Sequence, residues 1–153
     1  MRHEDVAMAL SGECLCGAIR FEVVRLVGPF ELCHCSRCRK AFGSAFAAMI
    51  GVNRDDFRWL AGQDLVRKYE APIRSFPPGY QTAFCSRCGS PAPNVPDDGD
   101  WFEVPVGLLD ETFAEVPDRH IFVDYGSLWH NIQDDLPRLT EREVIKLRLG
   151  AGE

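Results

Sequence analysis

Short apolar stretches recur along the chain in patterns that favour β-strands. Residues 18–24 (AIRFEVV) alternate apolar and polar side chains, as a half-buried strand does, whereas residues 45–52 (AFAAMIGV) form the continuous apolar run of a buried strand. Residues 65–70 (LVRKYE) and 80–84 (YQTAF) predict two further strands. The connection between these two contains Pro72, Pro77, Pro78 and Gly79, so we expect a hairpin or meander.

The second half of the chain continues this pattern and adds one helix signal. Residues 101–106 (WFEVPV) predict a strand whose Pro105 favours an edge or a bulge, and residues 120–125 (HIFVDY) predict another strand. Asn53, Asp55 and Asp56 supply turn chemistry, with a helical turn possible there. Thr140 and Glu143 match a capping box ahead of the apolar residues Val144, Ile145, Leu147 and Leu149, whose spacing leaves helix and strand both open.

The strands outnumber the helices, and no linker or internal repeat divides the chain. We therefore predict a mainly β fold, a single domain with short strands and few helices. A length of 153 residues fits one domain with a real core. The composition, 46% hydrophobic and 26% charged, is that of a globular protein rather than a disordered one.

Charge and targeting signals exclude several classes of partner. The formal net charge of −6 argues against nucleic acid, because phosphate binding depends on clustered Lys and Arg. No apolar run approaches the ~20 residues that span a bilayer, so no membrane partner is expected. The first residues (MRHEDVAMALSGE) lack the features of a secretory signal. We expect a cytoplasmic protein, in which closely spaced cysteines are metal ligands more often than disulfides.

The seven cysteines fall into an outer set of four and a middle set of three. The outer pairs, C-x-C and C-x-x-C, are each followed directly by a glycine, Gly17 or Gly89, as in zinc knuckles. Four thiolates saturate a tetrahedral zinc ion, so we assign the outer set to a structural site. The alternative, a thioredoxin-like dithiol at the second pair, lacks a surrounding βαβ pattern. The proposed ligands are Cys14, Cys16, Cys85 and Cys88.

The middle group, Cys33, Cys35 and Cys38, offers three thiolates and leaves one position of a zinc ion open. Water or an incoming sulfur nucleophile could take that position, and zinc would hold it as an anion near neutral pH. We therefore expect a catalytic zinc site, one whose ion can be labile. The alternative is a second structural site that His34, Asp124 or a partner chain completes.

Basic and imidazole side chains near the middle group are candidate helpers. Arg37, Arg39 and Lys40 could screen the thiolates or hold a substrate carboxylate, although a solvated basic patch is an equal alternative. His34 lies between two ligands, so its side chain should point away from the metal, behind the ligands or toward solvent. His120 and His130 are interpreted as structural histidines.

Taken in order, four segments resemble the glutathione-dependent formaldehyde-activating enzyme family, which also includes centromere protein V. The segments are GECLCGAIRFEV, CHCSRCRKAFGSAFAAMIGV, AFCSRCGSPAPNVP and RHIFVDYGSLWHNIQDDLP. The resemblance implies a zinc-containing β-tent domain over residues 12–137, with extensions at 1–11 and 138–153. It also implies a structural zinc on the outer cysteines and a catalytic zinc on the middle ones.

The activity that this resemblance implies is the addition of glutathione to formaldehyde, giving S-hydroxymethylglutathione. The reverse step cleaves a carbon–sulfur bond, so the enzyme would be classed as a carbon–sulfur lyase. We expect a small thiol of the glutathione type and an aldehyde as substrates. The alternative is a non-catalytic zinc scaffold or protein-interaction module, for which the centromere-associated relative is the analogy.

Overall fold

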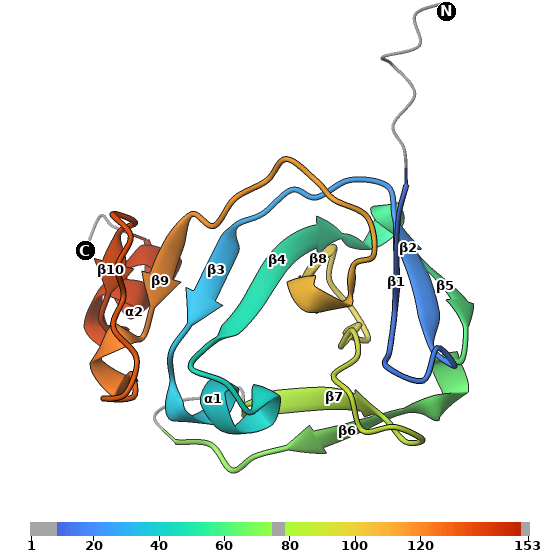
Figure 1. Ribbon diagram of the computed structural model, residues 1–153, viewed down its shortest axis with the longest axis horizontal. Coiled ribbons are helices and arrows are strands. Elements are labelled where there is room, and N and C mark those ends of the chain that lie inside the picture. The colour runs from blue at the N-terminus through green and yellow to red at the C-terminus, as the bar shows by residue number, and fades with distance from the viewer. Residues whose placement is uncertain (1–8, 75–78, 151–153) are drawn as a thin grey trace, which may run out of the picture. The chain divides into compact units, whose positions relative to one another are not determined.

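The computed structural model describes residues 9–74 and 79–150, so Pro77 and Pro78 of the predicted connection lie outside it. Within these residues the fold is mainly β, with ten strands and two α-helices (Figure 1). The chain divides into two compact units, Met1–Gly28 with Ile50–Ala114, and Pro29–Met49 with Glu115–Glu153. No helix in the described part of the chain is long and apolar enough to cross a membrane.

The first unit contains two antiparallel arrangements. Strands β1 (Leu10–Glu13), β2 (Arg20–Val23) and β5 (Phe57–Ala61) form a sheet in the order β1-β2-β5. Strands β6 (Val66–Glu70) and β7 (Gln81–Cys85) pair with each other in register from Val66 opposite Cys85 to Glu70 opposite Gln81. The predicted hairpin is confirmed, and β7 delivers the chain directly to Cys85. Strand β8 spans Trp101–Pro105.

The core of this unit is aromatic. The side chain of Phe21 is fully buried. Its ring centroid lies 5.4 Å from that of Phe57, which in turn lies 5.2 Å from that of Phe102. Such ring pairs add stabilisation beyond the apolar area that they bury. Phe21 lies opposite Gly12 on β1 and Trp59 on β5, so one ring connects all three strands.

The second unit is built on a parallel ladder. Strand β9 (Arg119–Ile121) lies between β3 (Phe30–Cys33) and β10 (Arg138–Leu139), and is parallel to both. The register places His120 opposite both Leu32 and Arg138. Helix α1 (Ser36–Phe42) follows β3 and ends at Gly43 in a left-handed conformation. The chain then enters strand β4 (Ala47–Asn53), which continues into the first unit.

Helix α2 (Glu141–Leu149) belongs to the second unit and resolves the ambiguity of the C-terminal pattern in favour of helix. Thr140 is its N-cap and forms the predicted capping box with Glu143. Tyr125 donates a hydrogen bond to Glu141 at the start of this helix, 2.6 Å from oxygen to oxygen. Val144 is its buried residue, 1% exposed, so one apolar side chain fixes the face that packs inward.

The prediction of a strand over residues 120–125 is wrong in its second half. Strand β9 ends at Ile121, and Phe122 adopts positive φ (57°), which a β ladder does not accept. A short 3-10 helix follows at Val123–Tyr125. The other 3-10 helices span Arg54–Asp56, where the sequence predicts a helical turn, Gln63–Leu65 and Val106–Leu108.

Candidate metal centres

The four outer cysteines converge in the first unit. All four Sγ atoms lie within 4.8 Å of one another. The Sγ atom of Cys16 lies 3.6 Å from that of Cys14 and 4.0 Å from that of Cys85. Cys14 follows β1, whereas Cys85 ends β7, so the cluster joins two distant parts of the sequence. The predicted outer set is therefore brought together in space.

Tight turns present these sulfurs to one another. Gly17 and Gly89 both have positive φ, 78° and 79°, which a residue with a Cβ adopts only with strain. The turns direct backbone N–H groups at sulfur: Ile19 donates to Cys14 and Arg87 donates to Cys85, each at 3.3 Å. Backbone donors of this kind stabilise thiolate charge.

The pKa values of Cys16 and Cys88 shift in opposite directions. Hydrogen bonding by Ser90, first through its side chain, lowers the pKa of Cys88 to about 5. The pKa of Cys16 is raised to about 11: the Ala18 backbone N–H lowers it, but desolvation and the neighbouring cysteines outweigh that effect. A cation bound among the four sulfurs would favour the thiolate form of all of them, and soft sulfur donors fit zinc.

The three middle cysteines converge in the second unit. Cys33 is the last residue of β3, Cys35 is the N-cap of α1, and Cys38 lies inside that helix. Their Sγ atoms lie within 4.8 Å of one another. The Cys35 sulfur caps the helix by accepting a hydrogen bond from the Cys38 backbone N–H at 3.3 Å. A strand end and a helix start therefore hold three thiols together, with Cys33 and Cys38 buried and Cys35 half-buried.

Crowding also separates the pKa values of this trio. Hydrogen bonds from the Cys33 and Cys38 thiols lower the pKa of Cys35 to about 2, and the backbone N–H groups of Cys38 and Arg37 contribute in the same direction. The same interactions raise the pKa of Cys33 far above its ordinary value. One thiolate forms readily and opposes the next, so a cation is needed for all three. The donor set fits a zinc ion with one open position.

No protein group completes this trio within the described residues. Among the described residues, no ligand atom of a His, Asp or Glu side chain lies within 4.8 Å of all three sulfurs. The predicted alternatives behave differently: Asp124 accepts a hydrogen bond from the Glu141 backbone N–H at 3.1 Å, and His34 turns toward His120. His34 is 2% exposed, so the solvent-facing option is wrong.

The three basic residues lie on α1 in different settings. Arg37 contributes its backbone N–H to the Cys35 sulfur, as described above. The Arg39 Nε is buried and has no hydrogen-bond partner in the described part of the chain, whereas Lys40 is exposed. An unpartnered buried guanidinium nitrogen is costly and favours an anionic ligand. Lys40 fits the alternative of a solvated charge.

A second polar cluster beside the trio was not predicted. His34 Nε2 lies 2.8 Å from His120 Nδ1, and His120 Nε2 lies 3.0 Å from Asp134 Oδ2. The rings of Phe46 and His130 lie near His34, with centroids at 5.3 Å and 6.1 Å. Burial, with His120 and His130 as secondary causes, lowers the pKa of His34 to about 4. The sequence shows one histidine, His34, between two cysteines and another, His120, in a predicted strand. Only the register of β3 and β9 brings the two side chains together.

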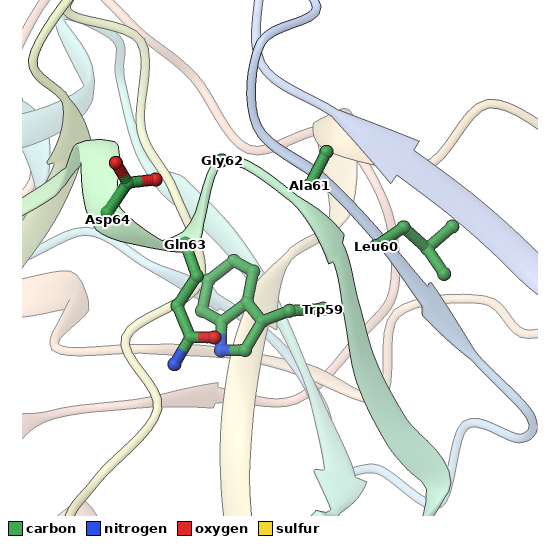
Figure 2. Close-up of a pocket in the computed structure, with 6 residues that line it drawn as sticks. All are labelled: Trp59, Leu60, Ala61, Gly62, Gln63 and Asp64. Atoms are coloured by element: carbon green, nitrogen blue, oxygen red, sulfur yellow. The ribbon is translucent and has the colours of Figure 1, made fainter.

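An open surface depression lies in the first unit, and none of its lining residues is a cysteine. It is lined by Trp59, Leu60, Ala61, Gly62, Gln63 and Asp64. Figure 2 shows Trp59 and Leu60 projecting on opposite sides of β5, with Gln63 beside the indole. The lining offers no cysteine, serine or histidine, and its one carboxylate, Asp64, has no basic or nucleophilic partner in the lining, so we do not assign chemistry to it. Trp59 also packs against the core around Cys14 and Cys85, which ties this surface to the outer cysteine cluster.

Comparison with known proteins gives a consistent result. The family model described as glutathione-dependent formaldehyde-activating enzyme matches residues 9–125. A Halomonas elongata protein, whose name assigns it provisionally to that activity, is 38% identical over 84 residues, 54% of each chain. This chain therefore spans about half the length of the curated relative that it matches.

A solved structure has a similar fold. The crystal structure of a Rhodobacter sphaeroides protein, a structural genomics target, is similar with a TM-score of 0.52 and 26% identity. The likeness covers 70% of this chain and 97% of that one. The family match takes in all seven clustered cysteines, because all of them lie between residues 9 and 125. The chain belongs to the glutathione-dependent formaldehyde-activating enzyme family.

Proposed function

We propose that this protein is a zinc-dependent enzyme that adds a small thiol of the glutathione type to an aldehyde, and that it also catalyses the reverse carbon–sulfur cleavage. The observation that carries the proposal is the trio of Cys33, Cys35 and Cys38, three converging sulfurs with no further protein ligand among the residues that the structure describes. Family membership supports glutathione and formaldehyde as the substrates.

The reaction involves no oxidation or reduction. The sulfur lone pair of the thiolate forms a bond to the aldehyde carbon while the carbonyl π electrons move onto oxygen. The proton that the thiol gave up ends on that oxygen, giving an S-hydroxymethyl thioether. A zinc ion bound by the three cysteines would supply Lewis acidity that favours the thiolate form of the substrate near neutral pH.

The chain's own residues shape the site. Backbone N–H groups of Arg37 and Cys38 stabilise negative charge on the Cys35 sulfur, and the rigid start of α1 fixes its position. We propose that Arg39 binds a carboxylate of the thiol substrate, because its buried Nε lacks a partner among the described residues. Lys40 would supply long-range attraction for the same anion.

We further propose a structural role for the outer cysteines and a wider fold assignment. The turns at Gly17 and Gly89 would be zinc knuckles that close a four-thiolate zinc site. Residues 12–137 would form a β-tent domain, flanked by the extensions 1–11 and 138–153. Backbone N–H donors to sulfur and the positive φ of both glycines support this reading.

The test is exchange between formaldehyde plus glutathione and their adduct, followed by NMR. The zinc-loaded protein should accelerate exchange over buffer, and Cys35→Ser should remove the acceleration. Serine keeps the N-cap of α1, so the helix should survive in the variant. Absence of acceleration by the native protein would exclude the formaldehyde assignment.

A thiol panel tests the role of Arg39. Arg39→Gln should raise KM for glutathione about tenfold or more, with little change for a thiol that has no carboxylate, such as 2-mercaptoethanol. Arg142→Gln, which removes an exposed arginine on α2, is the matched control. Equal effects on both thiols would contradict the carboxylate role.

One observation favours a second function, a protein-interaction module. Leu128 and Trp129 are adjacent in the second unit and 103% and 74% exposed, and exposed apolar neighbours of this kind often mark contact surfaces.

The ease with which zinc is released separates the enzyme from the protein-interaction module. An enzyme with an open trio should release that zinc to a chelator well before the four-cysteine site does, whereas a scaffold should retain both ions equally.

A further inference from the structure

A chain of three polar side chains in hydrogen-bond contact runs from the residue between Cys33 and Cys35 to the surface. His34 and His120 are each 2% exposed, whereas the Asp134 side chain is 46% exposed. His34 Nε2 lies 2.8 Å from His120 Nδ1. His120 Nε2 lies 3.0 Å and 3.1 Å from the two Asp134 carboxylate oxygens. The chain therefore connects a residue between two cysteines to a partly solvated carboxylate.

The sheet register explains why these rings meet. His120 lies opposite Leu32 in the parallel ladder of β3 and β9. Side chains two positions apart point to the same face of a strand, so His34 follows Leu32 to the face of His120. Cys33, one position away, points to the other face. The His34 backbone N–H donates to the Ile121 carbonyl at 2.9 Å, which extends the ladder to this residue.

The Asp134 carboxylate is itself held in place. The Leu136 backbone N–H donates to its Oδ1 at 3.0 Å. Arg138 donates to the backbone carbonyls of Asp134 and Ile132, at 2.9 Å and 3.2 Å. Arg138 lies on β10, directly opposite His120 on β9. The carboxylate therefore meets the imidazole at a position fixed by two strands.

Hydrogen-bond roles along the chain follow from the carboxylate. Its hydrogen bond from His120, and then that from Leu136, lowers the pKa of Asp134, so this group is an anion and only accepts. His120 must then donate from Nε2, which leaves Nδ1 as an acceptor in the neutral ring. His34 must donate from Nε2 and carry its lone pair on Nδ1. One carboxylate fixes the tautomer of both rings.

We propose that Asp134 and His120 are positioning residues for the three-cysteine site: they hold His34 in one tautomer and orientation and so fix the backbone between Cys33 and Cys35. This proposal depends on one part of the proposed function, namely that the trio of cysteines binds a metal ion. Loss of such a supporting hydrogen bond costs about 10- to 100-fold in metal affinity in known sites. The same range is expected here for the trio alone.

The experiment is Co²⁺ titration of the full chain, with the thiolate-to-cobalt absorption bands reporting each site. Asp134→Asn should weaken binding at the trio about 10- to 100-fold and leave the four-cysteine site unchanged. Asp134→Glu should restore part of the loss. Asp135→Asn, an exposed neighbour with the same change of charge, is the matched control and should bind as native protein does. Equal trio affinity in Asp134→Asn and Asp135→Asn would overturn the proposal.

A measurement on the zinc-loaded native protein keeps the proposal independent of how the variants fold. ¹⁵N NMR of the imidazoles should show both His34 and His120 as the Nε2–H tautomer, and Asp134→Asn should change the His120 signal. A native His34 in the Nδ1–H tautomer would overturn the proposal. Failure of the proposed enzyme function can be told apart from failure of this proposal. In that case the protein would not accelerate exchange between the thiol and its adduct, but the histidine tautomers and the differences in Co²⁺ affinity would remain.

Discussion

The Sγ atoms of Cys16 and Cys85 lie 4.0 Å apart although 69 positions separate the residues in the sequence. A metal at this point would close a long loop and would bind the folded chain far more tightly than the unfolded one. The trio of Cys33, Cys35 and Cys38 instead joins the end of β3 to the adjoining start of α1. The two clusters should therefore differ in what they contribute to stability.

Cys85→Ser should lower the free energy of unfolding of the zinc-loaded protein by at least about 3 kcal/mol, equivalent to roughly 10 °C in Tm. The buried serine would also lack the sulfur's ligand strength. Differential scanning calorimetry with zinc quantification measures both effects. Cys35→Ser is the matched control, because it removes a ligand from the local trio and retains a good N-cap, so its Tm should change much less. Equal losses in the two variants would contradict the division of roles.

Much of this arrangement could be predicted from the sequence, because cysteine spacing carries its own geometry. Sulfurs one or two positions apart converge by local turns, and counting ligands assigned the seven cysteines before any fold was known. The predicted glycine turns likewise follow from local chemistry, since Gly17 and Gly89 adopt the positive φ that only glycine accepts readily.

Other features depend on long-range pairing and carry no local signal. Helix α1 has seven residues and a cysteine as its N-cap, so neither length nor capping chemistry predicts it. The contact between His34 and His120 follows from the register of β3 and β9, which residue types do not specify. The strand predicted over 120–125 stops early because Phe122 takes positive φ, a conformation that its side chain disfavours.

Glu31 provides a prediction about a buried charge. Its carboxylate is 4% exposed and accepts from Arg119 Nε at 2.8 Å and from Arg148 at 3.0 Å. Glu31→Gln should cost about 3 kcal/mol, because the amide carries no charge and turns an NH2 donor, in place of an acceptor oxygen, toward one of the two arginines. Arg148→Gln should cost less than about 1 kcal/mol, since the Arg148 side chain is 52% exposed and solvent can replace the pair. Urea unfolding measures both, and a larger loss for Arg148→Gln would refute this ranking.

Gly51 on β4 is fixed by space rather than by backbone angle. A Cβ at this position would collide with the Gly28 carbonyl oxygen and with the Trp101 indole, whose Nε1 donates to that same oxygen at 3.0 Å. Gly51→Ala should therefore destabilise the protein by about 2 kcal/mol. Gly107→Ala, where a Cβ would meet nothing within 4 Å, is the control and should stay within about 0.5 kcal/mol of the native protein. Similar stabilities of the two variants in urea would show that the strand relaxes around the added methyl group.

The capping box of α2 gives the chain an acid-sensitive contact. The Thr140 backbone N–H, and then its side chain, lowers the pKa of Glu143 below the ordinary value of 4.5. A carboxyl whose pKa is lower in the folded state stabilises the fold above its unfolded pKa, and this contribution disappears as pH falls through the folded value. Thr140→Ala should cost about 1 kcal/mol at pH 7 by removing the N-cap.

Glu143→Gln, which removes the carboxyl that titrates, should respond less to acid than native protein as pH falls through the folded-state pKa of Glu143. Unfolding monitored by circular dichroism across this range measures the difference, and Thr140→Ser, which retains the hydroxyl group, should follow the native curve. Glu141→Gln is a second comparison, because that carboxylate accepts from Tyr125 at 2.6 Å and lies outside the box. If Glu143→Gln and native protein lose stability in parallel as pH falls, Glu143 does not couple the cap to pH, and the acid sensitivity of α2 arises from another carboxylate.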